Sequence, residues 1–281
     1  MHTVSASMIE FTVSRRGAQL VSLVKDDKQY ICANSPFWQY SSPTMFPIVG
    51  RLNNDTLRYQ GKSYKLMPHG FVRTRDFICV DDRPLTYRLS YDYDSLDVYP
   101  FPFVLTVSFQ PVNSELIITT RAQNPGEDTI WFSMGSCPAL KVPFYGGRFE
   151  DYTLEFNFDE HTTRLPLNSD ALLTGQRVTF ADQRRIPLNY DLFKDGALIF
   201  DNLKSTRVSI RRGDRAVTVR ADNVPCWGIW TKPNAPFLCI EPSCGLPDRA
   251  DFTDDFTKKP GVLSLEAGKS FSMQYSIFID A

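Results

Sequence analysis

The feature that most constrains the fold is a two-residue alternation of apolar and polar side chains that recurs along the chain. In residues 271–279 every odd position is apolar and the even positions are mostly polar, which is the period of a strand buried on one face. Residues 207–211 and 216–220 flank a glycine-containing turn at residues 212–215, so they predict a hairpin. This turn explains the Arg-Gly-Asp tripeptide of residues 212–214 better than a cell-adhesion role does.

Proline spacing supports the same fold class. The 19 prolines punctuate the chain at intervals that a helical domain would not tolerate. Short strands separated by turn residues predict an all-β protein, an antiparallel sandwich or barrel. No linker or internal repeat divides the sequence, so we expect one domain over residues 1–281. Further strands are expected at residues 57–59, 64–66, 104–109, 116–121 and 197–200.

Charge and composition limit the partners. Lys and Arg total 31 against 32 Asp and Glu, and they are scattered, so neither nucleic acid nor an anionic membrane is indicated as a partner. Residues 1–10 lack the pattern of a signal peptide, and no apolar run approaches a membrane span. We therefore expect a cytoplasmic protein.

The cysteines are expected to be reduced, because they are widely spread and no export signal accompanies them. A zinc site could be imagined from Cys226, Cys239 and Cys244, but no close cysteine pair or neighbouring histidine supports it. We expect no metal and no cofactor. The six cysteines are Cys32, Cys79, Cys137, Cys226, Cys239 and Cys244.

One of the three histidines is set among residues suited to chemistry. His69 lies between Pro68 and Gly70, which fix an unusual backbone path, and Phe71 and Arg73 follow it. A titratable ring beside a guanidinium is typical of a site for a polar substrate. The alternative is a loop histidine that hydrogen bonds to the backbone.

A carboxylate ends an apolar run near two tryptophans. Residues 237–240 predict a strand that delivers Glu241 to the mouth of the fold, with Trp227 and Trp230 nearby. Apolar surroundings would raise the pKa of Glu241 and suit it to exchange a proton near neutrality. Aromatic faces beside a carboxylate also suit a sugar. The alternative is a strand-end glutamate paired with an arginine.

Two further segments have the composition of a shaped pocket. Residues 45–51 form an apolar run that ends in Arg51, which either reaches the pocket or is merely solvated. Cys137 precedes Pro138, which holds the backbone extended. Cys137 is either a nucleophile or, since no paired base is evident, an inert buried cysteine.

These segments, in this order, resemble the aldose 1-epimerase (galactose mutarotase) family, and in particular its bacterial LacX-like branch. Each motif is weak alone, but the ordered set is specific and covers most of the chain. The segments that carry the resemblance are residues 17–23, 46–51, 69–73, 99–101, 137–139, 198–200 and 228–242.

The resemblance implies a large antiparallel β-sandwich that binds a sugar in an open groove and interconverts its α and β anomers without a cofactor. Glu241 matches the base that takes the proton of the anomeric hydroxyl. His69 and Arg73 match residues that contact the sugar, and Arg51 matches an arginine of the groove. The reaction needs this base together with an acid at the ring oxygen. We expect a monomer or a homodimer.

The sequence departs from the family pattern at two positions. Cys137 stands where most relatives carry a second histidine, the usual general acid, and a thiol with a reference pKa of about 8.5 donates a proton less readily than imidazolium. Gly196 stands where the family tends to have an aspartate, and Asp195 comes one residue earlier. Either Asp195 takes over after a one-residue shift, or the carboxylate is lost from the groove.

Two functions therefore remain open. The first is an aldose 1-epimerase of reduced or altered efficiency, with Glu241 as base and His69 or Cys137 as acid. The second is a non-catalytic carbohydrate-binding or sensing protein. A third function, that of a lyase or glycosidase, would rest on fold analogy only. A glycosidase also needs two carboxylates at a defined separation.

Overall fold

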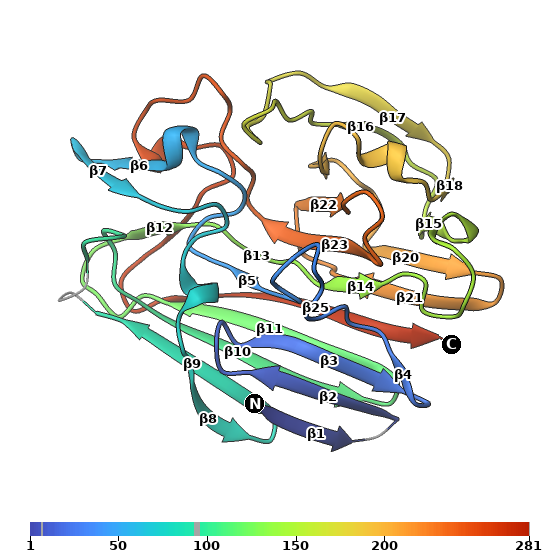
Figure 1. Cartoon of the computed structure of the whole chain (residues 1–281). Helices are drawn as coiled ribbons and strands as arrows, with labels where there is room; N and C mark the ends of the chain where they lie inside the picture. Colours follow the sequence, from blue (N-terminus) through green and yellow to red (C-terminus); the bar gives the residue numbers. More distant parts are fainter. Residues whose placement is uncertain (7, 93–95, 281) are drawn as a thin grey trace.

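The protein is built from β-strands and short 3₁₀ turns (Figure 1). The computed structural model describes residues 1–6, 8–92 and 96–280, with the backbone alone at residues 181 and 182. The predicted antiparallel all-β fold is confirmed. Among the described residues no helix is long and apolar enough to cross a membrane.

The largest sheet among the described residues has nine antiparallel strands, in the order β18-β15-β20-β21-β25-β11-β10-β9-β8. Its strands are β8 (Ile78–Asp82), β9 (Leu85–Tyr91), β10 (Phe103–Val112), β11 (Glu115–Gln123), β15 (Thr153–Phe156), β18 (Arg185–Pro187), β20 (Arg207–Arg212), β21 (Arg215–Arg220) and β25 (Ser270–Asp280).

A second sheet has six strands in the described part of the chain, in the order β19-β22-β23-β13-β5, and β14 also pairs with β23. Figure 1 shows this sheet stacked over the long strands β10, β11 and β25. Its strands are β5 (Thr44–Met45), β13 (Met134–Ser136), β14 (Ala139–Lys141), β19 (Leu198–Phe200), β22 (Cys226–Trp230) and β23 (Phe237–Cys244).

Smaller elements complete the fold. A four-stranded sheet packs on β10 through the stacked rings of Phe11 and Phe109, and two hairpins, β6–β7 and β16–β17, stand above the six-stranded sheet (Figure 1). The remaining strands are β1 (His2–Ala6), β2 (Ile9–Ser14), β3 (Gln19–Lys25), β4 (Lys28–Gln29), β6 (Thr56–Tyr59), β7 (Lys62–Lys65), β12 (Ile130–Phe132), β16 (His161–Arg164), β17 (Val178–Asp182) and β24 (Leu263–Leu265). The 3₁₀ turns are η1 (Asn53–Asp55), η2 (Val72–Thr74), η4 (Phe149–Asp151), η5 (Tyr190–Phe193) and η6 (Phe256–Lys258).

The predicted strands are confirmed. Residues 271–279 lie within β25, and the predicted hairpin is formed by β20 and β21. The other predictions correspond to β6, β7, β10, β11 and β19, although β7 begins and ends earlier than expected.

The core between the two large sheets follows from the same alternation. Every second residue of β10 from Phe103 to Phe109 is buried. Phe103 contacts the rings of Phe46 and Phe71, at centroid distances of 4.7 and 6.2 Å. Because Phe46 and Phe71 precede Arg51 and Arg73 closely, the core anchors both segments that the sequence analysis singled out.

We expect Phe103→Ala to lower the free energy of unfolding by about 3–5 kcal/mol, because it empties space around a ring with no exposed surface. Phe278→Ala is the matched control, since its ring on β25 is 38% exposed. Urea unfolding of both variants checks this expectation. Equal losses would contradict the assignment of the core.

Candidate functional site

Strand β23 carries the central carboxylate of the site. It is buried along its whole length, and its residues alternate between two apolar clusters. Leu238 and Ile240 belong to the main core, whereas Phe237 and Cys239 face the other side. Glu241 follows Cys239 by two residues, so it projects to the side away from the core.

The same rule separates the two tryptophans of β22. Trp227 is buried in the main core, whereas Trp230 packs on the opposite face. Because they are three positions apart in a strand, they point in opposite directions. Of the two, only Trp230 lines the large cavity described next.

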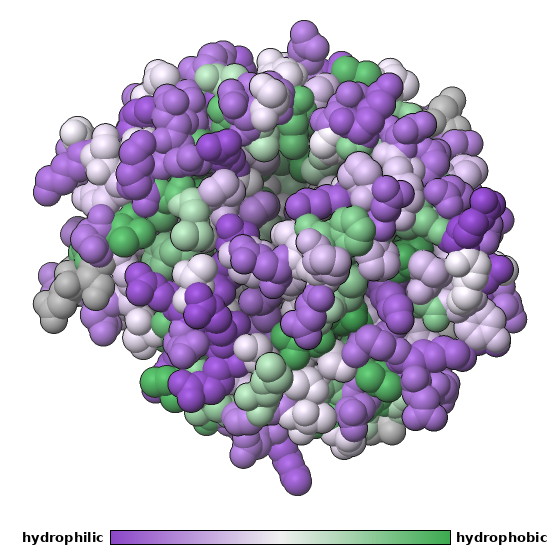
Figure 2. Space-filling model, viewed as in Figure 1, coloured by the Kyte–Doolittle hydropathy of each residue, from purple (hydrophilic) through white to green (hydrophobic). Residues whose placement is uncertain are grey.

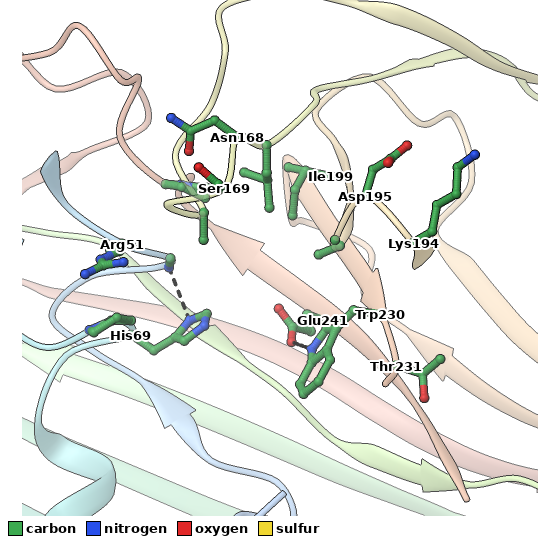
Figure 3. A pocket seen from close by; sticks show the side chains of 17 residues that line it. Arg51, His69, Asn168, Ser169, Lys194, Asp195, Ile199, Trp230, Thr231 and Glu241 are labelled. Carbon is green, nitrogen blue, oxygen red and sulfur yellow. Dashed lines mark hydrogen bonds between the residues drawn. The ribbon is translucent and has the colours of Figure 1, made fainter. Parts of the chain in front are cut away.

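A cavity of about 670 Å³ opens above this face of the six-stranded sheet. Figure 2 shows the surface hollowed between the β6–β7 and β16–β17 hairpins. In Figure 3, Arg51 and His69 lie on one side, Lys194 and Asp195 on the other, and Glu241 and Trp230 between them. The lining residues are 50–51, 68–69, 167–169, 171, 194–197, 199, 230–231, 241 and 247.

Glu241 is held by two donors. The thiol of Cys137 donates to its Oε1 at 2.7 Å, and the indole Nε1 of Trp230 donates to the same oxygen. Gly228 is paired opposite Glu241, and a Cβ at Gly228 would lie 2.9 Å from Oε2. The absence of a side chain there leaves room for the carboxylate.

Burial raises the pKa of Glu241, while the hydrogen bonds from Cys137 and Trp230 and the charge of Arg73 oppose the rise. A carboxylate with a raised pKa is a stronger base toward a hydroxyl proton. Among the described residues no arginine forms a salt bridge with Glu241, so the alternative of a glutamate ion-paired with an arginine is not supported, and Arg73 acts on Glu241 only through its charge.

His69 lies at the opposite wall and is tied to Gly50. Its backbone has a φ of 64°, and its N–H donates to the Gly50 carbonyl at 2.7 Å. The Gly50 N–H donates back to Nδ1 of the ring at 3.2 Å (Figure 3). Since Nδ1 accepts, the neutral ring carries its proton on Nε2. His69 thus makes the backbone hydrogen bond of the alternative interpretation and also lines the cavity.

Burial, together with the charge of Arg73, lowers the pKa of His69 to about 3. The ring is therefore neutral at physiological pH. Its Nε2–H can donate a hydrogen bond to a ligand oxygen, but the residue is not an imidazolium acid.

The two arginines have different positions. Arg73 is buried outside the lining of the large cavity, where Nη2 donates to the Pro68 carbonyl at 2.6 Å and the guanidinium lies 4.5 Å from the centre of the Tyr40 ring. Arg51 lines the cavity, and its Nε and Nη2 donate to the two carboxylate oxygens of Asp55 at 2.7 and 2.8 Å. Asp55 therefore neutralises the charge of Arg51 at the cavity wall.

Cys137 lies behind Glu241 and does not line the large cavity. Its thiol is buried beside Cys239, and burial raises its pKa well above the ordinary value. The protonated thiol is therefore directed at the carboxylate of Glu241 and not at the cavity.

Asp195 does reach the cavity wall. One carboxylate oxygen lies 3.7 Å from Nη2 of Arg164, and the side chain is 62% exposed. Gly196 follows with a φ of 98°, a conformation that favours glycine. Lys194 lines the same wall. A carboxylate is therefore present at the cavity, at position 195 instead of 196. The binding of a sugar by Asp195 stays a prediction.

Two segments of the cavity wall, at Asn168 and at Pro247, were not predicted from the sequence. Asn168 forms a turn by accepting backbone hydrogen bonds from Asp170 and Leu172, each at 3.0 Å. The wall at Pro247 is held by Lys259, whose buried ammonium lies 3.3 Å from a carboxylate oxygen of Asp248. The Asn-Ser-Asp cluster at residues 168–170 is a recognisable turn signal, whereas nothing local marks the buried ion pair.

The structure does not bring together Cys226, Cys239 and Cys244, the three cysteines considered above as a zinc site. Among the described residues, a buried group of possible ligands consists of Cys137, Cys239 and Glu241, whose ligand atoms lie within 4.8 Å of one another. Cys226 and Cys244 are not part of it.

We expect the stability of the protein to fall as the pH drops from about 6.5 toward 3, in part because of His69. In the unfolded chain the imidazole takes up a proton near its ordinary pKa, whereas in the folded chain the pKa is about 3. The unfolded state then binds more protons, so acid favours unfolding. His69→Asn should weaken this dependence by a few kcal/mol between pH 6.5 and 4.

Urea unfolding at several pH values, with NMR titration of the His69 ring, measures the effect. A ring that titrates near 6.5 in the folded protein would contradict the interpretation.

Comparisons with known proteins agree with the fold. A family model described as aldose 1-epimerase matches residues 2–277. Protein LacX of Lactococcus lactis subsp. lactis is 29% identical over 277 residues, which cover 90% of this chain and 91% of LacX.

Two solved structures are similar over nearly their whole lengths. A galactose mutarotase related enzyme from Lactobacillus acidophilus has a TM-score of 0.94 at 32% identity, covering 100% of this chain and 97% of that one. A galactose mutarotase-like protein from Lactobacillus casei has a TM-score of 0.92 at 27% identity, covering 99% of both chains.

Proposed function

Since the chain belongs to the aldose 1-epimerase family, we propose that it interconverts the α and β anomers of an aldose in the large cavity. The observation that carries the proposal is the pairing of a buried carboxylate, Glu241, with the neutral ring of His69 on the wall of one cavity. Trp230 lines the same cavity and offers an aromatic surface to the C–H face of a sugar.

In the proposed reaction, Glu241 takes the proton of the anomeric hydroxyl as the bond from the anomeric carbon to the ring oxygen breaks. The acid gives a proton to the ring oxygen, the open-chain aldehyde forms, and the acid recovers this proton when the ring closes again. Rotation about the adjacent carbon–carbon bond presents the other face of the carbonyl, and the reverse steps close the other anomer. No free alkoxide or oxocarbenium is needed, because both proton transfers accompany the bond change.

The acid has two candidates. His69 lines the cavity and can donate from Nε2 to the ring oxygen, stabilising its developing charge as a neutral donor. Cys137 remains the second candidate, although its thiol hydrogen bonds to Glu241. We favour His69 because it lines the cavity and Cys137 does not.

A non-catalytic sugar-binding protein is the second candidate function. It is favoured by one observation, namely that Cys137 stands where the resemblance predicts a general-acid histidine. We favour the enzyme because the carboxylate of Glu241 and the ring of His69 both line the cavity. A cytoplasmic location, a single domain over residues 1–281, and a monomeric or homodimeric state remain predictions.

We expect Glu241→Gln to reduce anomer exchange by at least about 100-fold while sugar binding persists, because the amide cannot accept the proton. Exchange spectroscopy by NMR measures the rate, and calorimetry measures binding. Glu266→Gln, at an exposed position outside the cavity lining, is the control and should retain the wild-type rate. Full activity in Glu241→Gln would remove this residue from the role of base.

We also expect an uncharged aldose to be preferred over its 6-phosphate. The charged side chains that line the cavity, Arg51, Lys194, Asp195 and Glu241, offer two cations and two carboxylates, and Asp55 already neutralises Arg51. A phosphate dianion would find little net positive charge there.

NMR exchange on free and phosphorylated aldoses measures this preference. Faster exchange of a phosphorylated sugar would contradict it. If no aldose exchanges while one binds, the binding-protein function is supported instead.

A further inference from the structure

Behind the base lies a cluster of three potential metal ligands that the proposed reaction does not use as a unit. The sulfur atoms of Cys137 and Cys239 and a carboxylate oxygen of Glu241 all lie within 4.8 Å of one another, and all three residues are buried. We propose that this cluster binds a thiophilic divalent cation of the Zn²⁺ class and that the bound ion inhibits the protein.

The sheet register brings the three ligands to one face. Ala139 of β14 is paired opposite Cys239 of β23. Cys137 precedes Ala139 by two residues and Glu241 follows Cys239 by two, so all three side chains project on the side of Cys239. Cys137 and Cys239 lie together in the second apolar cluster, away from the main core. The arrangement is thus set by backbone pairing and not by flexible loops.

The spacing suits a small tetrahedral ion. Zinc lies about 2.3 Å from thiolate sulfur and about 2.0–2.2 Å from carboxylate oxygen, which places neighbouring ligands roughly 3.3–3.8 Å apart. In the present structure Sγ of Cys137 lies 2.7 Å from Oε1 of Glu241, and all three ligand atoms lie within 4.8 Å of one another. Binding would therefore require the hydrogen-bonded Cys137–Glu241 pair to separate by about 1 Å. Two sulfur ligands favour Zn²⁺ over Mg²⁺ or Ca²⁺, which prefer all-oxygen sites.

The charge of the loaded site would be balanced. Two thiolates and one carboxylate carry three negative charges, a divalent ion supplies two positive charges, and Arg73 supplies the third. Arg73 is buried and interacts electrostatically with Cys137 and with Glu241. Its Nε is a buried donor that has no hydrogen-bond partner among the described residues. Binding would release the two thiol protons to solvent.

The ion would also have an entry path and an open position. Glu241 lines the large cavity, whereas Cys137 and Cys239 lie behind it. An ion held by three protein ligands therefore keeps its fourth position for water or a ligand hydroxyl. Occupation would engage the carboxylate that we propose as the base, so the inhibitory effect rests on the proposed function, whereas the binding site itself does not.

Direct binding tests the site without reference to activity. We expect the reduced full-length protein to bind one Zn²⁺ per chain in equilibrium dialysis, and Co²⁺ in its place to show thiolate-to-metal charge-transfer absorption. Cys239→Ser should weaken Zn²⁺ binding by more than about 10-fold and remove part of the charge-transfer band. Cys244→Ser, another buried cysteine on β23 outside the cluster, should leave both unchanged.

Glu241→Gln serves as a second variant of nearly unchanged volume, and it should also weaken binding. The proposed metal site is contradicted if the folded wild type does not bind one Zn²⁺ per chain. It is also contradicted if Cys239→Ser and Glu241→Gln both bind Zn²⁺ as tightly as the wild type does.

Activity separates this proposal from the proposed function. In wild type, one equivalent of Zn²⁺ should suppress anomer exchange and a chelator should restore it, whereas Cys239→Ser should keep its exchange rate in the same Zn²⁺. A protein that binds Zn²⁺ at these residues but exchanges no aldose when metal-free would overturn the proposed function and leave the metal site standing. Exchange that persists in the Zn²⁺-loaded wild type would overturn the inhibitory role.

Discussion

The position of Glu241 in the cavity depends on the pairing and burial of β23. This strand hydrogen bonds to β22 on one side and to β13 and β14 on the other, so its register is fixed along its length. One face packs in the core through Leu238 and Ile240, and the other carries Glu241. Although Glu241 lines the cavity, only 6% of the residue is exposed, and burial is the main reason that its pKa is raised.

On the opposite wall of the cavity, burial has the converse effect on the pKa of His69. The backbone N–H of His69 donates to the Gly50 carbonyl, and the Gly50 N–H donates to Nδ1 of the imidazole, which makes Nδ1 the acceptor nitrogen. The same physical cause, burial, raises the pKa of Glu241 and lowers that of His69, because in each case it disfavours the charged form. Burial thus makes Glu241 a stronger base and keeps His69 a neutral hydrogen-bond donor, which are the two roles that the proposed ring opening assigns to them.

The strands and the position of Glu241 could be predicted from sequence because period-two patterning is a local property. The same rule, applied to β22, also separates Trp227 from Trp230, since residues three apart in a strand face opposite ways. The burial of Arg73 against Tyr40 could not be predicted, because that contact joins segments that only the tertiary fold brings together. The contact between Cys137 and Glu241 joins residues 104 positions apart and depends on the register of β14 with β23.

The cysteine at position 137 changes the electrostatics of the base as well as the supply of protons. A histidine there could become an imidazolium, which would stabilise the carboxylate of Glu241 and weaken it as a base. The protonated thiol of Cys137 donates a hydrogen bond but adds no positive charge, and Arg73 is the cation that acts on Glu241 among the described residues. In the proposed reaction a stronger base would thus act with a weaker acid, so that ring opening would depend more on removal of the anomeric proton than on protonation of the ring oxygen.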